Sequence, residues 1–250
     1  MSASSQSQSG SFSRAVGGRI NATGARFMFA KSTRALMTGL GINNPIAAYV
    51  CGRGGVLGDV AAEVVESAFG FMHPEMIATN WAEGTAIASA RSASDAYREG
   101  CFVFGRETLG DIDGIDEFAA LAERVIDAAP LAGLALFAGW KAEPRPSDGP
   151  ARAALALQTL RELRGSAHLV GIVAVGLEPK LAAAVKSPGN LKMFGWGELT
   201  ADGASLQPQL DAAEDITDVI VGPAFATLSS TEQARFDAVL TAIADKLNNS

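Results

Sequence analysis

The sequence has few of the residues on which metal sites and many catalytic sites depend. Its 250 residues include two cysteines, Cys51 and Cys101, and two histidines. Metal sites usually need about three or four ligands, and no Cys-x-x-Cys or His-x-x-x-His spacing is present, which argues against a metal site. Two cysteines far apart in the chain indicate buried thiols in a reducing compartment, so we expect a cytoplasmic protein.

Aromatic residues and long apolar runs are also scarce. Aromatic residues make up 7% of the chain, whereas hydrophobic residues reach 48% and are mostly alanine and leucine. Because alanine and leucine favour helices over strands, the composition predicts a mainly helical protein. No apolar run has the length of a membrane span, and the N-terminus lacks the pattern of a signal peptide, so we expect no membrane partner.

Negative charge is absent from the first part of the chain. The net charge is −7, which argues against nucleic acid as a partner, yet no acidic residue precedes Asp59. Basic residues are present throughout this stretch: Arg14, Arg19, Arg26, Lys31, Arg34 and Arg53. We expect a basic tail and a solvated helix face, or alternatively an arm that docks on an acidic partner or on phosphate.

The hydrophobic pattern predicts a series of helices after a disordered tail over residues 1–22. The expected helices cover residues 23–40, 45–51, 60–69, 74–81, 85–104, 115–128, 131–141, 151–164, 178–186, 206–221 and 229–246. Three prolines and a glycine within residues 143–150 predict a break. Ser229 and Glu232 have the spacing of a capping box, which predicts the start of the last helix.

The fold class predicted by this order is all-α with small β wings. Two winged-helix-like modules in tandem would cover residues 23–110 and 151–250, with connecting helices and a proline-rich loop over 111–150. The second module lacks a recognition helix, because Ser187-Pro188-Gly189-Asn190 reads as a turn. Residues 194–199 are the strongest strand signal and would form half of a wing.

Several motifs resemble those of known regulators. Residues 199–203 (LTADG) and the two final helices are similar to MarR-type winged-helix regulators, in which the equivalent helices build a dimer interface. The whole chain is more similar to an actinobacterial helix-turn-helix family of unassigned function, on residues 49–58 (YVCGRGGVLG), 69–74 (FGFMHP), 130–133 (PLAG) and 163–168 (LRGSAH). The resemblance implies a fold more than a reaction.

The candidate binding residues are charged, aromatic or titratable side chains, most of them within or beside these motifs. They are Tyr49, Arg53, Phe71, His73, Trp140, Arg164 and His168. Each has an ordinary structural alternative: core packing for the aromatic rings and histidines, and a salt bridge for the arginines, because an unpaired buried charge is very costly. The functional hypothesis places His73 and His168 in one pocket between the modules, with an arginine at its polar end.

We therefore expect a small-molecule-binding protein on a degenerate winged-helix scaffold, with a ligand that carries an acidic group. The alternatives are a DNA-binding transcriptional regulator and an enzyme that uses His73 and His168 in the same pocket. The sequence names no cofactor. A homodimer is expected from an apolar stripe on the last helix, formed by Phe236, Val239, Leu240, Ile243 and Leu247.

Overall fold

The computed structural model describes residues 3–249, with the backbone alone for residues 3–10. Over this part of the chain the protein is all-α, with twelve α-helices and no strand. The helices are α1 (Ala3–Gly24), α2 (Lys31–Gly39), α3 (Pro45–Gly54), α4 (Ala62–Phe69), α5 (Pro74–Ile87), α6 (Ala90–Leu109), α7 (Ile115–Ala128), α8 (Ala135–Lys141), α9 (Gly149–Ala174), α10 (Pro179–Lys186), α11 (Gly203–Phe225) and α12 (Ser230–Asn248). Three short 3-10 helices lie at Arg26–Phe29 (η1), Gly55–Leu57 (η2) and Pro188–Asn190 (η3).

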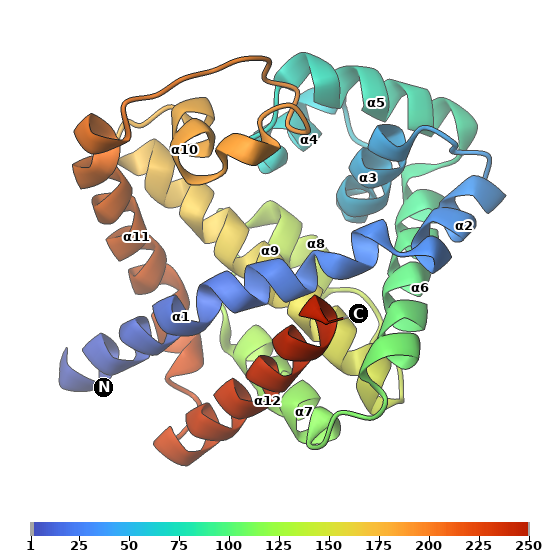
Figure 1. The fold of residues 1–250 in the computed structure, drawn as a ribbon. Coiled ribbons are helices and arrows are strands. Elements are labelled where there is room, and N and C mark those ends of the chain that lie inside the picture. Colours follow the sequence, from blue (N-terminus) through green and yellow to red (C-terminus); the bar gives the residue numbers. More distant parts are fainter. Residues whose placement is uncertain (1–2, 250) are drawn as a thin grey trace.

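The long helix α9 is the centre of the molecule. It runs through the middle of Figure 1, and α1, α6, α7, α8 and α11 all pack against it. Ala153, Leu157, Leu160 and Leu163 of α9 are almost fully buried. One hydrophobic cluster extends from Val16 in α1 to Leu247 in α12, so both halves of the chain contribute to the same core.

Helix boundaries follow the local signals in the sequence. The break at 143–150 separates α8 from α9, and α9 begins where the Asp148 side chain accepts a hydrogen bond from the Ala151 amide. The predicted capping box is confirmed at the start of α12, where Ser229 and Glu232 exchange hydrogen bonds. Residues 187–190 are confirmed as a turn, since η3 is followed by no helix until Gly203.

Two expectations differ from the structure. The predicted β wings are absent from the described residues, because the segment 194–199 has no neighbouring strand with which to pair and forms turns instead. Residues 3–24, expected to lie mostly in a disordered tail, form α1. Val16 and Ile20 lie one turn apart on α1 and are buried in the core, which gives this helix an apolar stripe despite its polar composition.

The apolar stripe of α12, which suggested a dimer, is covered within the chain. Phe236, Leu240 and Ile243 are fully buried, and α12 packs against α1 and α7 (Figure 1). Phe236 contacts the rings of Phe118 and Phe225 at centroid distances of 4.7 and 6.0 Å. This stripe therefore closes the core of one chain and needs no partner to cover it.

Replacing Phe236 should consequently destabilise a single chain. We predict that Phe236→Ala lowers the free energy of unfolding by about 3–5 kcal/mol, because it leaves a cavity in the core. Urea denaturation measures this, with Val219→Ala as the control, since Val219 is 75% exposed on α11 and its loss should cost no more than about 0.5 kcal/mol. A loss that grows on dilution of the protein would show instead that the stripe lies between chains.

Candidate functional site

A buried ion pair joins α3 to α9. Arg53 donates from Nε and Nη2 to the two carboxylate oxygens of Glu162, each at 2.8 Å. Arg161 Nη1 and Gln158 Nε2 also donate to Glu162, at 2.7 and 2.8 Å, and Arg53 Nη1 donates to the Tyr49 hydroxyl at 2.9 Å. The Glu162 side chain is 1% exposed and the Arg53 side chain 12%, so this is a charged network inside the core.

The surroundings of Arg53 are aromatic. Its guanidinium lies 4.3 Å from the ring centroid of Phe69, the last residue of α4. The indole Nε1 of Trp140 donates to the Arg53 carbonyl at 3.2 Å. The structure thus brings together three of the predicted binding residues, Tyr49, Arg53 and Trp140. Together with Glu162 they form what we call the interior group.

The carboxylate of the interior group is paired within the protein. Burial raises the pKa of Glu162, but the charges of Arg53 and Arg161 and the hydrogen bonds from Arg53 and Gln158 outweigh this and hold it below its ordinary value. Arg53 therefore has the structural role that a buried arginine most often has, and it offers no free charge to a ligand.

A second polar group lies further along α9, where α11 crosses it. Arg164 Nη2 donates to Glu214 at 2.6 Å, and the other Glu214 oxygen is 3.7 Å from His168 Nδ1. His168 Nδ1 is also 3.2 Å from the Thr217 hydroxyl, and its ring stacks on Phe71 with 6.0 Å between centroids. Side chains of this group are partly exposed, so solvent reaches them.

The turn between α4 and α5 links this second polar group to the segment that contains Phe194 and Trp196. Gly70 has φ +25° and packs so closely on Leu169 of α9 that a Cβ would overlap that side chain, so the turn requires glycine. His73 follows, and its amide donates to the Phe194 carbonyl at 2.7 Å. Its ring lies 4.6 Å from that of Trp196, whose Nε1 donates to the Phe71 carbonyl at 2.8 Å.

Residues 187–202, which we call the covering segment, are thus attached to the body chiefly at this turn. Leu191 packs with Ala183 and Ala184 of α10 in a small hydrophobic cluster that is separate from the main core, with Trp196 at its edge. A second small cluster joins α10 to the ends of α9 and α11 and includes Phe71 at its edge. The two small clusters meet the rest of the protein at Phe71, His73, His168 and Trp196, and we call this place the seam.

The structure therefore divides the seven predicted site residues. Phe71, His73, Arg164 and His168 lie at or beside the seam, whereas Tyr49, Arg53 and Trp140 lie in the interior group. Sequence reasoning missed Glu162 and Glu214. An acidic residue among the apolar residues of 155–163 was the available signal for Glu162, because such a residue must be paired.

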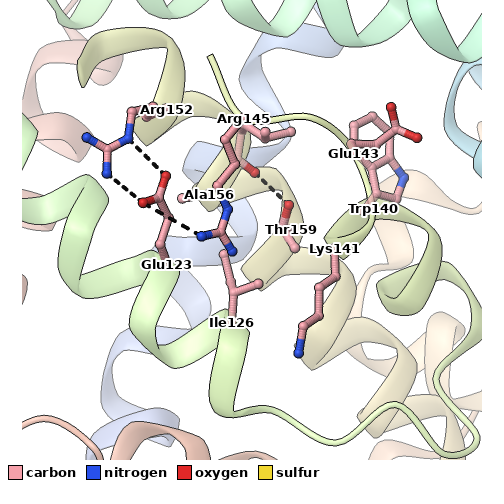
Figure 2. A pocket seen from close by; sticks show the side chains of 10 residues that line it. Glu123, Ile126, Trp140, Lys141, Glu143, Arg145, Arg152, Ala156 and Thr159 are labelled. Carbon is pink, nitrogen blue, oxygen red and sulfur yellow. Dashed lines mark hydrogen bonds and ion pairs between the residues drawn. The ribbon is translucent and has the colours of Figure 1, made fainter. Parts of the chain in front are cut away.

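The surface depression drawn in Figure 2 does not lie at the seam; it borders the interior group at Trp140. It is lined by Trp140, Lys141, Arg145 and Thr159, among others, and its volume of about 10 Å³ is that of a single water molecule. Arg145 and Arg152 lie beside the carboxylate of Glu123 (Figure 2). The depression is therefore too small to hold a ligand, and its charged side chains already have partners. No group of three His, Cys, Asp or Glu side chains within residues 3–249 is placed to hold a metal ion.

A short helix, a four-residue turn and a second helix are present at α4 and α5. This arrangement is that of a helix-turn-helix, in which the second helix would read the major groove. Helix α5 contains no lysine or arginine, and its exposed side chains include Glu75 and Glu83.

In the described part of the chain no single helix has the length and composition of a membrane span; α9 and α10 together do, across a bend of 118°.

Comparison with known families identifies the scaffold. The model of a helix-turn-helix family matches residues 13–191. The chain belongs to this helix-turn-helix family. The matched residues include α4, α5 and α9, and with them the interior group and most of the seam. No curated protein and no solved structure matches the chain.

The Arg53–Glu162 pair gives a prediction for stability. We predict that Glu162→Leu lowers the free energy of unfolding by about 3–5 kcal/mol, because it strands a buried guanidinium, and that adding Arg53→Leu restores part of the loss. Urea denaturation measures both variants. Arg235→Ala, which removes an exposed pair with Glu117, is the control and should cost at most about 1 kcal/mol. If the double variant is less stable than Glu162→Leu, the charge is not the cause.

His168 gives a prediction for pH. Burial lowers its pKa below the ordinary 6.5, helped by Arg164 and Lys186 and opposed by Glu214. The folded protein therefore binds this proton less readily than the unfolded chain, so the stability is complete above pH 6.5 and decreases as the pH falls below it. His168→Gln should flatten this decrease in the free energy of unfolding. Because a single proton is involved, the decrease in the wild-type protein is at most about 1.4 kcal/mol per pH unit. An unchanged pH profile of urea midpoints would contradict it.

Proposed function

We propose that this protein binds a small molecule at the seam, and that the covering segment moves away from the body to admit it. The observation that carries the proposal is the convergence of Phe71, His73, His168 and Trp196 at the seam, with the partly exposed Arg164–Glu214 pair beside them. Ligand sites usually combine apolar walls with a few placed polar groups, and this is the chemistry present here.

The proposed ligand has a flat apolar part and an acidic group. The rings of Phe71 and Trp196 supply faces for the flat part. The acidic group would bind the Arg164 guanidinium, which donates from Nη2 to Glu214 in this structure and has a buried Nη1 without a hydrogen-bond partner among the described residues. His168, uncharged when its pKa is low, can donate or accept one hydrogen bond.

The attachment of the covering segment supports its movement. Its apolar residues form a small cluster with α10, from which Phe194 alone also packs against the main core, and its polar contacts to the body include the His73 amide and the Phe71 carbonyl. Elements with few buried apolar contacts open at a lower free energy than the core. We further propose that the scaffold derives from a transcriptional regulator, with a C-terminal part related to MarR-type regulators, and that α5 without basic residues no longer reads DNA.

Native mass spectrometry of the protein purified from its own host tests the proposed function. We predict a retained small molecule in the wild-type protein, and its loss by at least about tenfold in Trp196→Ala and His168→Ala, which remove one wall and one polar group. Tyr49→Phe is the control, since it removes only a hydroxyl from the interior group and should retain the molecule.

Two results would contradict the proposal. One is a molecule that is retained equally by all three variants, which would place it away from the seam. The other is nanomolar, sequence-selective binding of duplex DNA at physiological salt, because α5 and the net charge of −7 predict only weak and salt-sensitive binding.

A further inference from the structure

The basic residues near the N-terminus fall into two classes in the structure. Arg14, Arg19 and Arg53 are each paired with carboxylates of distant helices, on α11, α12 and α9 respectively. These three charges fasten the first helices to the rest of the body. They are therefore not available to a partner.

The other three cations flank one exposed aromatic residue in the sequence. Arg26, Lys31 and Arg34 are exposed on η1 and α2, and none of them pairs with a carboxylate among residues 3–249; Arg26 donates to the Asn248 side-chain oxygen at 2.5 Å. Phe29 lies between them in the chain and is 68% exposed. We call these four residues, Arg26, Phe29, Lys31 and Arg34, the basic corner.

The basic corner differs from the rest of this acidic protein. Most other lysine and arginine side chains of the described chain pair with a carboxylate, and Lys141 donates to backbone carbonyls. The remaining two, Lys186 and Lys192, lie at either end of η3, far along the chain. Positive charge without a carboxylate partner among the described residues is thus concentrated within nine residues of the chain, which also include the exposed ring of Phe29.

We propose that the basic corner binds single-stranded nucleic acid, with Phe29 stacked on a base and the three cations on neighbouring phosphates. Stacking on an aromatic side chain needs an unpaired base, and it tolerates any sequence because every base has a flat face. Phosphate contacts then supply affinity that depends on salt. The corner is a site separate from the seam and does not depend on the proposed ligand.

Charge and shape favour a single strand over two other anionic surfaces. Electrostatic binding to an anionic membrane typically needs a cluster of about four to eight cations, and the corner has three. Duplex DNA keeps its bases stacked within the helix, so Phe29 would have no base to contact. A flexible strand can place one base on Phe29 and adjacent phosphates on α2.

Fluorescence anisotropy with a labelled oligothymidylate tests the proposal on the full chain. The expected affinity is weak, with a slope of log K against log salt of about −2, the value for three phosphate contacts on a single strand. Phe29→Ala should weaken binding about tenfold, and Lys31→Glu with Arg34→Glu should abolish it. Both changes are on the surface, and unchanged circular dichroism and thermal midpoint verify the fold.

The control has the same change of charge at the other unpaired lysines. Lys186→Glu with Lys192→Glu should leave binding within about twofold of wild type, because the corner is intact. Equal loss in this variant would overturn the proposal in favour of general charge. So would binding of duplex DNA as tight as the single strand, or binding to vesicles containing phosphatidylserine without binding to the oligothymidylate.

Discussion

The rest of the structure depends on one buried carboxylate. Glu162 lies in the middle of α9, in the core, and it is stabilised by two guanidinium groups. Because stranding either charge in the core would cost several kcal/mol, α3 must lie where the Arg53 side chain reaches Glu162 of α9, and its packing on α5 and α6 holds it there. Phe69 lies against Arg53 at the end of α4, so the same pair also fixes the start of the turn that carries Phe71 and His73.

Two regions of different character result from this arrangement. Around the interior group, charges are paired, aromatic rings cover them, and one cluster of apolar side chains links α1 to α12. Around the seam, the polar side chains are partly exposed and most apolar contacts belong to two small clusters, with Phe194 also packed against the main core. The first region has the features of a rigid scaffold and the second has those of a site that opens. The proposed binding site is therefore positioned by the core without being part of it.

Much of the helical pattern could be predicted from the sequence, because its signals are local. The proline-rich break at 143–150 and the Ser229–Glu232 capping box are decided within a few residues of each boundary. The β wings were predicted wrongly, since a strand depends on a partner that local sequence does not show. For the site, the need of Arg53 and Arg164 for partners was predictable, but their identities, Glu162 and Glu214, depend on how α3 and α11 pack on α9.

If a ligand enters at the seam as we propose, the seam must open while the core stays closed. Native-state amide hydrogen exchange, followed by NMR at increasing denaturant below the unfolding transition, tests it most directly. The His73 amide donates to the Phe194 carbonyl across the seam, whereas the Leu160 amide lies within the buried part of α9. We expect the His73 amide to exchange by a local opening of low free energy that denaturant hardly changes, and the Leu160 amide to exchange only on global unfolding. Equal protection of the two amides, with the same denaturant dependence, would contradict it.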